Sequence, residues 1–519
     1  MKLNYKRTIL VGFAFFLISL FWQAYDSTIP LLLTNKFGMS QGLSGVIMAI
    51  DNILALFLLP MFGTFSDKCK SKFGKRTPFI VIGTVVASVA LVALSFVDAA
   101  QLNNIKAVSE IDSPAALEIL YEEEGDVSLI TPEGESFVLS EKFTKEDYVN
   151  IKSQIENEEG KKVTNPDYTN YVAPARQAYA WQQTLNNPGT IVAFVLLLLI
   201  VLVAMGTFRS PAVALMPDVT MKPLRSKANA IINLMGTAGG ILVLLLGMVF
   251  ATSAVKNSLM SYTTFYFVIA GIMLAALIAF IFTVKEVKWA KEMQENSIKY
   301  GIEENEEKES TGKGKKLSKA ELTSLILILA SIALWYFGYN AVTSKYSVYA
   351  ANVLQKDYNT TMLIAQAAAI VSYLPAGMIA SKLGRKKTIL GGVVMLSTAF
   401  LLASFIRSNS STMIMNILFA LAGIGWATIN VNSFPMVVEM CSGADVGKYT
   451  GFYYTASMAA QIATPMLSGM LMDAFGMTIL FPYAAIFAAL AFVTMFFVKH
   501  GDSKPVSKKD LLENFDVED

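Results

Sequence analysis

The chain is poor in the residues from which catalytic sites and metal centres are usually built. It has one histidine and two cysteines in 519 residues, and only 16% of its residues are charged. His500 lies near the C-terminus, and neither a phosphate-binding loop nor a cluster with metal-ligand spacing occurs. Cys69 and Cys441 lie in two polar loops that we expect on the same side of a membrane, so a disulfide framework is not expected. These absences argue against an enzyme, a resident metal or cofactor, and nucleic-acid binding.

Hydrophobic residues, in contrast, make up 54% of the chain and recur in long runs. Each run has about 20 residues, enough for a helix to cross a hydrocarbon core of roughly 30 Å. Only helices and closed barrels satisfy their backbone hydrogen bonds in lipid, and runs without polar alternation exclude a barrel. The sequence therefore predicts an all-α membrane protein with twelve transmembrane helices.

The expected helices fall into two sets of six. They cover about Thr8–Thr34, Leu43–Phe65, Phe79–Val97, Gly189–Ala214, Lys227–Phe250 and Thr263–Val284 in the first set, and Leu322–Ala350, Thr360–Ile379, Thr388–Ile406, Thr412–Val438, Lys448–Leu471 and Thr478–Val498 in the second.

Residues 100–188 form a long polar segment between the third and fourth helices. The segment holds 16 Asp or Glu against 7 Lys or Arg, a balance typical of an extracytoplasmic insert. Ser113 with Pro114 predicts a helix start, VSLITPEGESFVLS predicts a hairpin, and Thr144 with Asp147 resembles a capping box. We expect the insert to be at least partly folded, and the alternative is a disordered acidic linker.

Polar segments and the placement of positive charge define the organisation of the rest. The loop Gly63–Pro78 carries five Lys or Arg and, with the other basic loops, predicts cytoplasmic N- and C-termini in a multi-pass protein of the plasma membrane. The expected units are 1–99 (helices 1 to 3), 100–188 (insert), 189–284 (helices 4 to 6), 285–320 (cytoplasmic linker), 321–498 (helices 7 to 12) and 499–519 (cytoplasmic tail).

The two halves repeat one pattern at the turn between their second and third helices. The repeat aligns Gly63, Asp67, Gly74, Lys75 and Arg76 with Gly377, Ser381, Gly384, Arg385 and Lys386, and the first copy is four residues longer. Parallel halves around a pseudo-two-fold axis place a solute site between them, near the middle of the membrane.

This pattern resembles the signature of the major facilitator superfamily. More narrowly, SDKCKSKFGKRTPF and FRSPAVALMPDVTMKPLRSKANAI resemble the glycoside, pentoside and hexuronide cation symporters and the sucrose/proton symporters. The resemblance implies a major facilitator fold and uptake of a di- or oligosaccharide by alternating access with co-transported H+ or Na+. We expect a monomer whose partners are a small solute and the lipid bilayer. A transporter or exporter of another organic solute, and a non-transporting membrane sensor, remain alternatives.

The coupling ion does not follow from the resemblance. Melibiose-type sodium symporters carry carboxylates where this chain has Ala55 and Leu59, and sucrose-type proton symporters carry an aspartate where it has Leu198. Asp26 and Asp51 are the cation-coupling candidates instead, because ionisable groups in lipid cost roughly 2.5 to 3.5 kcal/mol and these two lie at the same expected depth. Capping or hydrogen bonding of a neighbouring helix is the alternative role.

Aromatic and amide side chains in the helices are the substrate-binding candidates, because a sugar offers apolar faces and a rim of hydroxyl groups. They are Trp22, Gln23, Arg209, Trp335, Tyr336, Tyr339, Asn340, Gln366, Asn430 and Gln461. Interfacial or lipid-facing positions are the alternative for each, and Lys345 is expected to reach solvent by snorkelling.

A third group of charged residues is assigned to gating. It consists of Asp67, Arg76, Asp218, Arg225, Arg385 and Glu439. The resemblance implies that Asp67 meets a basic residue of its loop and the start of helix 11, and we pair Glu439 with Arg385 on the other side. The alternative is that these charges only set the topology.

Overall fold

The computed structural model describes residues 3–157, 160–221, 224–300, 317–438, 440 and 446–501. Glu439, Cys441, residues 301–316 of the predicted linker and nearly all of the predicted tail therefore lie outside the described residues.

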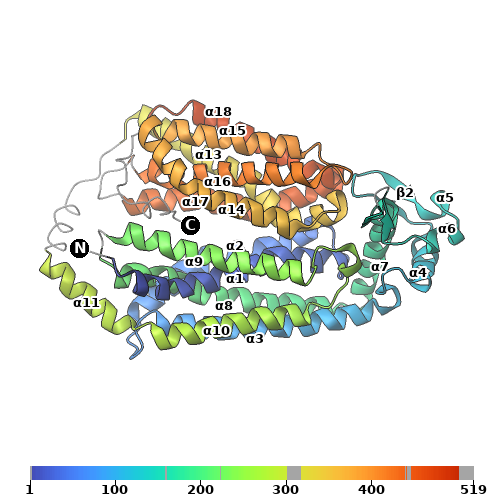
Figure 1. The fold of residues 1–519 in the computed structure, drawn as a ribbon, viewed down its shortest axis with the longest axis horizontal. Helices are drawn as coiled ribbons and strands as arrows, with labels where there is room; N and C mark the ends of the chain where they lie inside the picture. The colour runs from blue at the N-terminus through green and yellow to red at the C-terminus, as the bar shows by residue number, and fades with distance from the viewer. Residues whose placement is uncertain are drawn as a thin grey trace.

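Two layers of long helices make up the body of the molecule (Figure 1). The N-terminal half consists of α1 (Tyr5–Asn35), α2 (Gln41–Lys68), α3 (Thr77–Asn104), α8 (Gly189–Val219), α9 (Arg225–Val249) and α10 (Thr263–Thr283). The C-terminal half consists of α13 (Lys319–Tyr349), α14 (Tyr358–Leu383), α15 (Arg385–Ala403), α16 (Thr412–Val438), α17 (Val446–Phe475) and α18 (Leu480–Phe496).

Length and composition mark most of these helices as membrane spans. Within the described residues, 10 helices are long and apolar enough to cross a membrane. The two remaining long helices, α14 and α17, have 26 and 30 residues and pack within the same bundle. Several helices contain proline, as Pro60 in α2 and Pro465 in α17 illustrate, which membrane helices tolerate because neighbouring groups satisfy the freed carbonyls.

Each half has its own apolar core. In the N-terminal half the core contains Leu17, Leu94 and Phe208, and in the C-terminal half it contains Trp335, Leu396 and Phe481. Helix α2 packs against α17 and α9 packs against α14, so these helices form much of the seam between the halves. Two separately packed bodies that meet along a seam can move relative to each other.

The insert is folded and lies at one end of the bundle (Figure 1). Its main elements are α4 (Pro114–Glu124), β1 (Ser128–Ile130), β2 (Ser136–Val138), α5 (Leu139–Lys142), α6 (Lys145–Val149), β3 (Gln154–Glu156), β4 (Lys162–Thr164), the π-helix η2 (Tyr168–Val172) and α7 (Ala173–Asn186). Its own core includes Leu117, Leu120 and Tyr148. The disordered-linker alternative is therefore wrong for the described residues of this segment.

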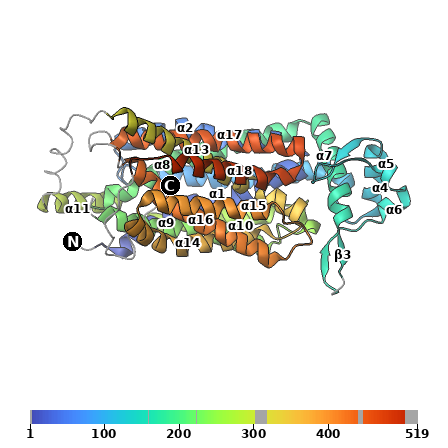
Figure 2. The same cartoon turned by 90° about the horizontal axis from the view of Figure 1, so that it is seen from above.

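Local signals of the insert work as the sequence predicted. Ser113 caps α4, with its hydroxyl accepting from the Ala116 amide, and the Thr144 hydroxyl accepts from the Asp147 amide at the start of α6. The first predicted hairpin forms from β1 and β2, which pair antiparallel. A second hairpin, β3 with β4, projects away from the body of the insert (Figure 2).

The insert belongs in sequence to the N-terminal half but also contacts the C-terminal half. The Met477 amide donates to the Pro132 carbonyl oxygen at 2.8 Å, and Gln355 Nε2 donates to Thr169 Oγ1 at 3.0 Å. Arg407 Nε lies 3.6 Å from Glu133 Oε1. The insert therefore spans both halves at this end, which we call the insert end.

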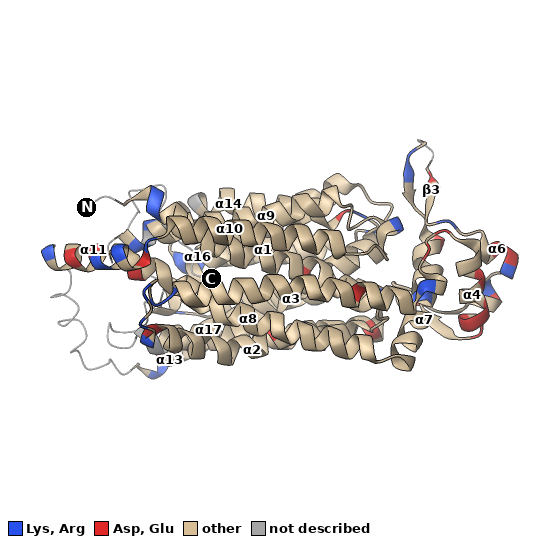
Figure 3. Cartoon of the chain, turned by 90° about the horizontal axis from the view of Figure 1, so that it is seen from below, with Lys and Arg blue, Asp and Glu red and all other residues tan. Residues whose placement is uncertain are grey.

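Lysine and arginine residues gather at the opposite end of the bundle (Figure 3). This end, which we call the basic end, carries the loop between α2 and α3 and the helix α11 (Glu286–Lys299). Arg7 ties α11 to the start of α1, because its Nη1 lies 2.6 Å from Glu292 Oε2 and its guanidinium covers the Trp289 ring.

Candidate functional site

A cavity of about 510 Å³ lies between the two halves. Its walls come from α1, α2, α8 and α9 on one side and from α13, α14, α16 and α17 on the other. This volume is typical of small-molecule sites, and the seam between two bodies is where such sites are often found. We call it the central cavity.

Most of the predicted binding and coupling residues line the central cavity. They are Trp22, Gln23, Asp26, Asp51, Arg209, Tyr339, Asn340, Gln366 and Gln461. The other three candidates lie outside its lining. Trp335 is fully buried in the core of the C-terminal half, Tyr336 packs edge-on against Trp426, and Asn430 is buried within α16.

An amide pair joins the halves across the cavity. Gln366 Nε2 on α14 donates to Gln23 Oε1 on α1 at 2.7 Å, and Gln23 Nε2 donates to Ser27 Oγ at 3.0 Å. Primary amides both donate and accept, so the same two groups can exchange this contact for hydroxyl groups of a solute.

Two carboxylates and one guanidinium supply the charge of the cavity. Asp51 Oδ1 accepts from the Asn52 amide nitrogen at 2.6 Å and from Asn52 Nδ2 at 2.8 Å. Asp26 and Arg209 line the same cavity, and the Arg209 guanidinium lies 5.8 Å from the centre of the Trp22 ring. One positive group beside two acids leaves a negative charge that a bound cation could neutralise.

The aromatic wall contains a residue that sequence reasoning missed. Trp426 on α16 stacks on Tyr339, with ring centres 3.7 Å apart and planes 3° from parallel. Two further polar groups of the wall, Trp22 Nε1 and Asn340 Nδ2, have no hydrogen-bond partner among the described residues. The wall thus combines a flat apolar surface with donors, the combination that suits a sugar ring.

The insert end of the seam is closed in this structure. Both carboxylate oxygens of Asp473 on α17 accept at 2.7 Å from backbone amides at the start of α2, those of Gln41 and Gly42. Close packing of the same two helices requires glycine, because a Cβ at Gly45 would lie 2.0 Å from the Pro465 carbonyl oxygen.

Lys345 also lies in this closed seam. Its Nζ donates to the Gln41 carbonyl oxygen at 2.6 Å and to Ser44 Oγ at 2.7 Å, and the residue is fully buried. The prediction that Lys345 snorkels to solvent is therefore wrong. The amine finds its partners at the start of α2, a contact that hydropathy along one helix cannot reveal.

At the basic end, Arg76 gathers several of the predicted gating residues. Its Nε lies 2.7 Å from Asp218 Oδ2, its Nη2 lies 2.5 Å from Asp67 Oδ1, and its Nη1 donates to Ser66 Oγ. Lys75 Nζ lies 3.3 Å from Asp218 Oδ1. All of these residues belong to the N-terminal half, so the cluster braces that half internally.

Glu286, which the sequence reasoning did not single out, completes this cluster. It is buried, and its carboxylate accepts from the backbone amides of Lys75, Arg76 and Thr77 and from Thr77 Oγ1 at distances from 2.7 to 3.2 Å. A carboxylate that accepts hydrogen bonds from the first amides of α3 caps this helix, although it comes from a segment far away in the sequence.

The remaining gating candidates lie apart from this cluster. Arg225 begins α9 and donates to the Thr220 and Pro217 carbonyl oxygens at 3.2 and 3.1 Å, capping the end of α8. Arg385 begins α15, and its expected partner Glu439 lies outside the described residues.

Solved structures with the same fold include transporters of unlike solutes. The xylose transporter XylE from E. coli, in an inward open conformation, matches 98% of this chain and 99% of its own with a TM-score of 0.61 at 14% identity. A bacterial homologue of the iron transporter ferroportin, in an inward-facing state, matches 95% of this chain and 99% of its own with a TM-score of 0.58 at 12% identity. At such identities the likeness shows the fold alone.

Curated relatives match only parts of the chain. The sucrose transport protein SUC3 of Arabidopsis thaliana is 39% identical over 62 residues, which cover 12% of this chain and 10% of that protein. The MFS-type transporter ppzB of Metarhizium rileyi is 28% identical over 136 residues, which cover 26% of this chain and 28% of that protein. The alignments thus span about a tenth and about a quarter of the two relatives.

Family models cover most of the chain. The model described as MFS/sugar transport protein matches residues 10–101, and the model of the Major Facilitator Superfamily matches residues 178–372 and 355–515. Together with the all-helical fold in two halves and the central cavity, these matches show that the chain is a multi-pass membrane protein that belongs to the Major Facilitator Superfamily.

Proposed function

We propose that the protein is a secondary transporter that couples the uptake of a neutral glycoside, a di- or oligosaccharide, to a cation gradient. The solute binds in the central cavity, and the halves rock around it so that the cavity opens alternately at the insert end and at the basic end. The distribution of Lys and Arg supports a cytoplasmic basic end, with the insert outside the plasma membrane and both termini inside.

The observation that carries this proposal is the composition of the cavity wall. The stacked pair Tyr339 and Trp426 offers a flat apolar surface, and the amide pair Gln23 and Gln366 offers donors and acceptors at the seam. Hydroxyl groups of a sugar satisfy such amides better than an apolar solute would, because unpaired buried amides cost free energy. The partial likeness to a sucrose transport protein and to the MFS/sugar transport model supports the same solute class.

Asp26 and Asp51 carry the coupling in this proposal. Binding of H+ or Na+ beside the two carboxylates neutralises the charge that Arg209 leaves uncompensated, so the loaded cavity can close without a buried net charge. Cation and solute then move together, because closure is favourable only when both sites are filled.

Transport into proteoliposomes tests the proposal. The protein should accumulate a labelled glycoside above its external concentration under an inward proton or sodium gradient, and failure with every glycoside under both gradients would refute the solute class. Asp26→Asn and Asp51→Asn should each abolish accumulation while leaving exchange of solute measurable. Glu146→Gln on the exposed surface of the insert is the matched control and should transport like the wild type. Full accumulation by both aspartate variants would remove the pair from the coupling mechanism.

A further inference from the structure

A second cavity, of about 530 Å³, lies at the insert end. Its lining comes from three parts of the chain: the insert, the loops of the N-terminal half and the loops of the C-terminal half. Because Asp473 and Gln41 lie in its wall, it sits directly on the closed part of the seam and is distinct from the central cavity. We call it the vestibule cavity.

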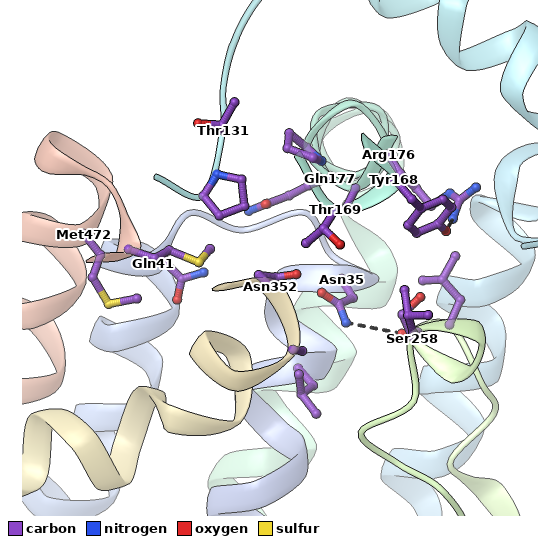
Figure 4. A pocket seen from close by; sticks show the side chains of 18 of the residues that line it. Asn35, Gln41, Thr131, Tyr168, Thr169, Arg176, Gln177, Ser258, Asn352 and Met472 are labelled. Atoms are coloured by element: carbon purple, nitrogen blue, oxygen red, sulfur yellow. Dashed lines mark hydrogen bonds between the residues drawn. The ribbon is translucent and has the colours of Figure 1, made fainter. Parts of the chain in front are cut away.

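At least one amide side chain from each of the three parts lines this space. Asn35 comes from the end of α1, Gln177 from α7 of the insert, and Asn352 from the π-helix η5 (Ala350–Leu354) of the C-terminal half. Figure 4 shows Asn35, Asn352 and Gln41 along one side of the space, with Thr131, Thr169 and Gln177 opposite. The three amides are half-buried, so each presents part of its surface to the cavity.

Several of these groups retain hydrogen-bonding capacity. Gln41 is 3% exposed, and neither its Nε2 nor its Oε1 has a partner among the described residues. Gln177 uses its Nε2 on the Met39 carbonyl oxygen at 2.8 Å, which leaves its Oε1 as an acceptor. A buried amide without a partner is costly, so a polar occupant of the cavity would be stabilised by it.

The charged residues of the wall differ in how far they are paired. Asp473 gives both oxygens to backbone amides. The Arg176 guanidinium donates to the Tyr168 hydroxyl and lies 5.6 Å from the centre of the Tyr168 ring, but its Nε and Nη2 have no hydrogen-bond partner among the described residues. Tyr168 and Tyr262 add aromatic surface to the lining. Amides, hydroxyls, aromatic rings and the unpartnered N–H groups of Arg176 suit an occupant rich in hydroxyl groups.

We propose that the vestibule cavity is a second, external binding site for a polyhydroxylated solute of mono- or disaccharide size. A solute held there touches both halves and the insert, so it binds best while the insert end is closed and favours that conformation. The ligand class follows from the residues of the vestibule wall, so this site is tested independently of solute binding in the central cavity.

Protection of an engineered cysteine tests the site. In a Cys69→Ser, Cys441→Ser background, the Asn352→Cys variant in proteoliposomes is labelled by a membrane-impermeant maleimide added on the insert side. Sucrose and maltose are the probe solutes, and proline, which is not rich in hydroxyl groups, is the negative control. A sugar at about ten times its Kd should slow labelling by about tenfold, because the free fraction falls as 1/(1 + [L]/Kd). Ile155→Cys, on the exposed β3 strand, is the matched control and should be labelled at an unchanged rate.

Two further variants separate this site from the central cavity. Gln366→Leu, in the central cavity, should leave the protection of Cys at position 352 by sugar intact. Gln177→Leu, in the vestibule cavity, should weaken the apparent affinity for sugar severalfold. If Asn352→Cys disturbs folding, Thr131→Cys reports on the same cavity. Loss of protection in Gln366→Leu, or equal labelling with and without either sugar, would overturn the site. Protection without gradient-driven accumulation would refute only the proposed transport function, and accumulation without protection would refute only the vestibule site.

Discussion

In the N-terminal half, the turn between α2 and α3 is long, and charged side chains hold it: Arg76 contacts Asp67 and Asp218, and Glu286 caps the start of α3. In the C-terminal half, only Gly384 separates α14 from α15, and Lys386 Nζ donates to the carbonyl oxygens of Phe496 and Val498 at the end of α18. The repeated glycines keep one shared feature, since Gly74 and Gly384 both have positive φ, 114° and 93°.

The two turns differ in length and in the contacts that hold them. The first amides of α3, like those of any helix, have no partner within the helix, and Glu286 supplies the acceptor that they need. In the short turn, the Gly384 amide still donates to the Ala380 carbonyl oxygen, and the lysine instead stabilises the end of a neighbouring helix. Equivalent turns in the two halves of one fold can therefore be held by unrelated interactions. Substitutions at each turn should have effects of different size.

The largest effect is expected for Arg76→Ala. The side chain is 5% exposed, and its loss leaves the partly buried Asp218 with only the longer contact to Lys75. Removal of one partner of such a pair should cost about 3 kcal/mol, measured as a lower unfolding midpoint of the purified protein. Arg76→Lys keeps the charge but not the forked geometry and should recover part of the loss, whereas an unchanged midpoint in Arg76→Ala would show that the cluster does not stabilise this half.

A smaller loss is expected for Glu286→Gln. The amide keeps one acceptor oxygen but loses the charge that favours the start of α3, so we expect a cost of about 2 kcal/mol in the same measurement. Glu295→Gln, on the exposed surface of α11, is the control and should leave the midpoint unchanged. If the two variants unfold alike, the capping role of Glu286 is wrong.

The smallest effect is expected for Lys386→Met. The methionine keeps most of the apolar stem but removes the charge from the end of α18, which should cost about 1 kcal/mol. Lys387→Met at the adjacent exposed position should cost nothing measurable. A loss as large as that of Arg76→Ala would erase the contrast between the two turns.

Much of the architecture was predictable because it depends on local patterns. Apolar runs gave the helices of both halves, and the cap at Ser113 and the first hairpin of the insert followed from short signals. Hydropathy also indicated which polar residues face inward, as Gln23, Asp26 and Asp51 illustrate.

What the sequence could not give is which face of each helix turns to the seam. Depth along a helix is hidden as well, because Trp335 and Tyr339 share one face of α13, one turn apart, yet the first is in the core and the second lines the central cavity. Trp426, Glu286 and Lys345 acquire their partners from segments far away in the chain. Such contacts depend on how the halves pack, and a period of 3.6 residues carries no information about the neighbour.

The contacts of the insert with the C-terminal half would slow the opening of the insert end in the proposed transport cycle. Opening that separates the insert from this half would break the hydrogen bonds from Met477 to Pro132 and from Gln355 to Thr169, at a net cost of about 1 kcal/mol each, while the exposed pair of Arg407 with Glu133 adds little. About 2 kcal/mol added to a barrier slows a step by about thirtyfold. In the proposed cycle the insert would therefore set the timing of opening, and weakening these contacts would give faster turnover at the cost of a less stable closed state.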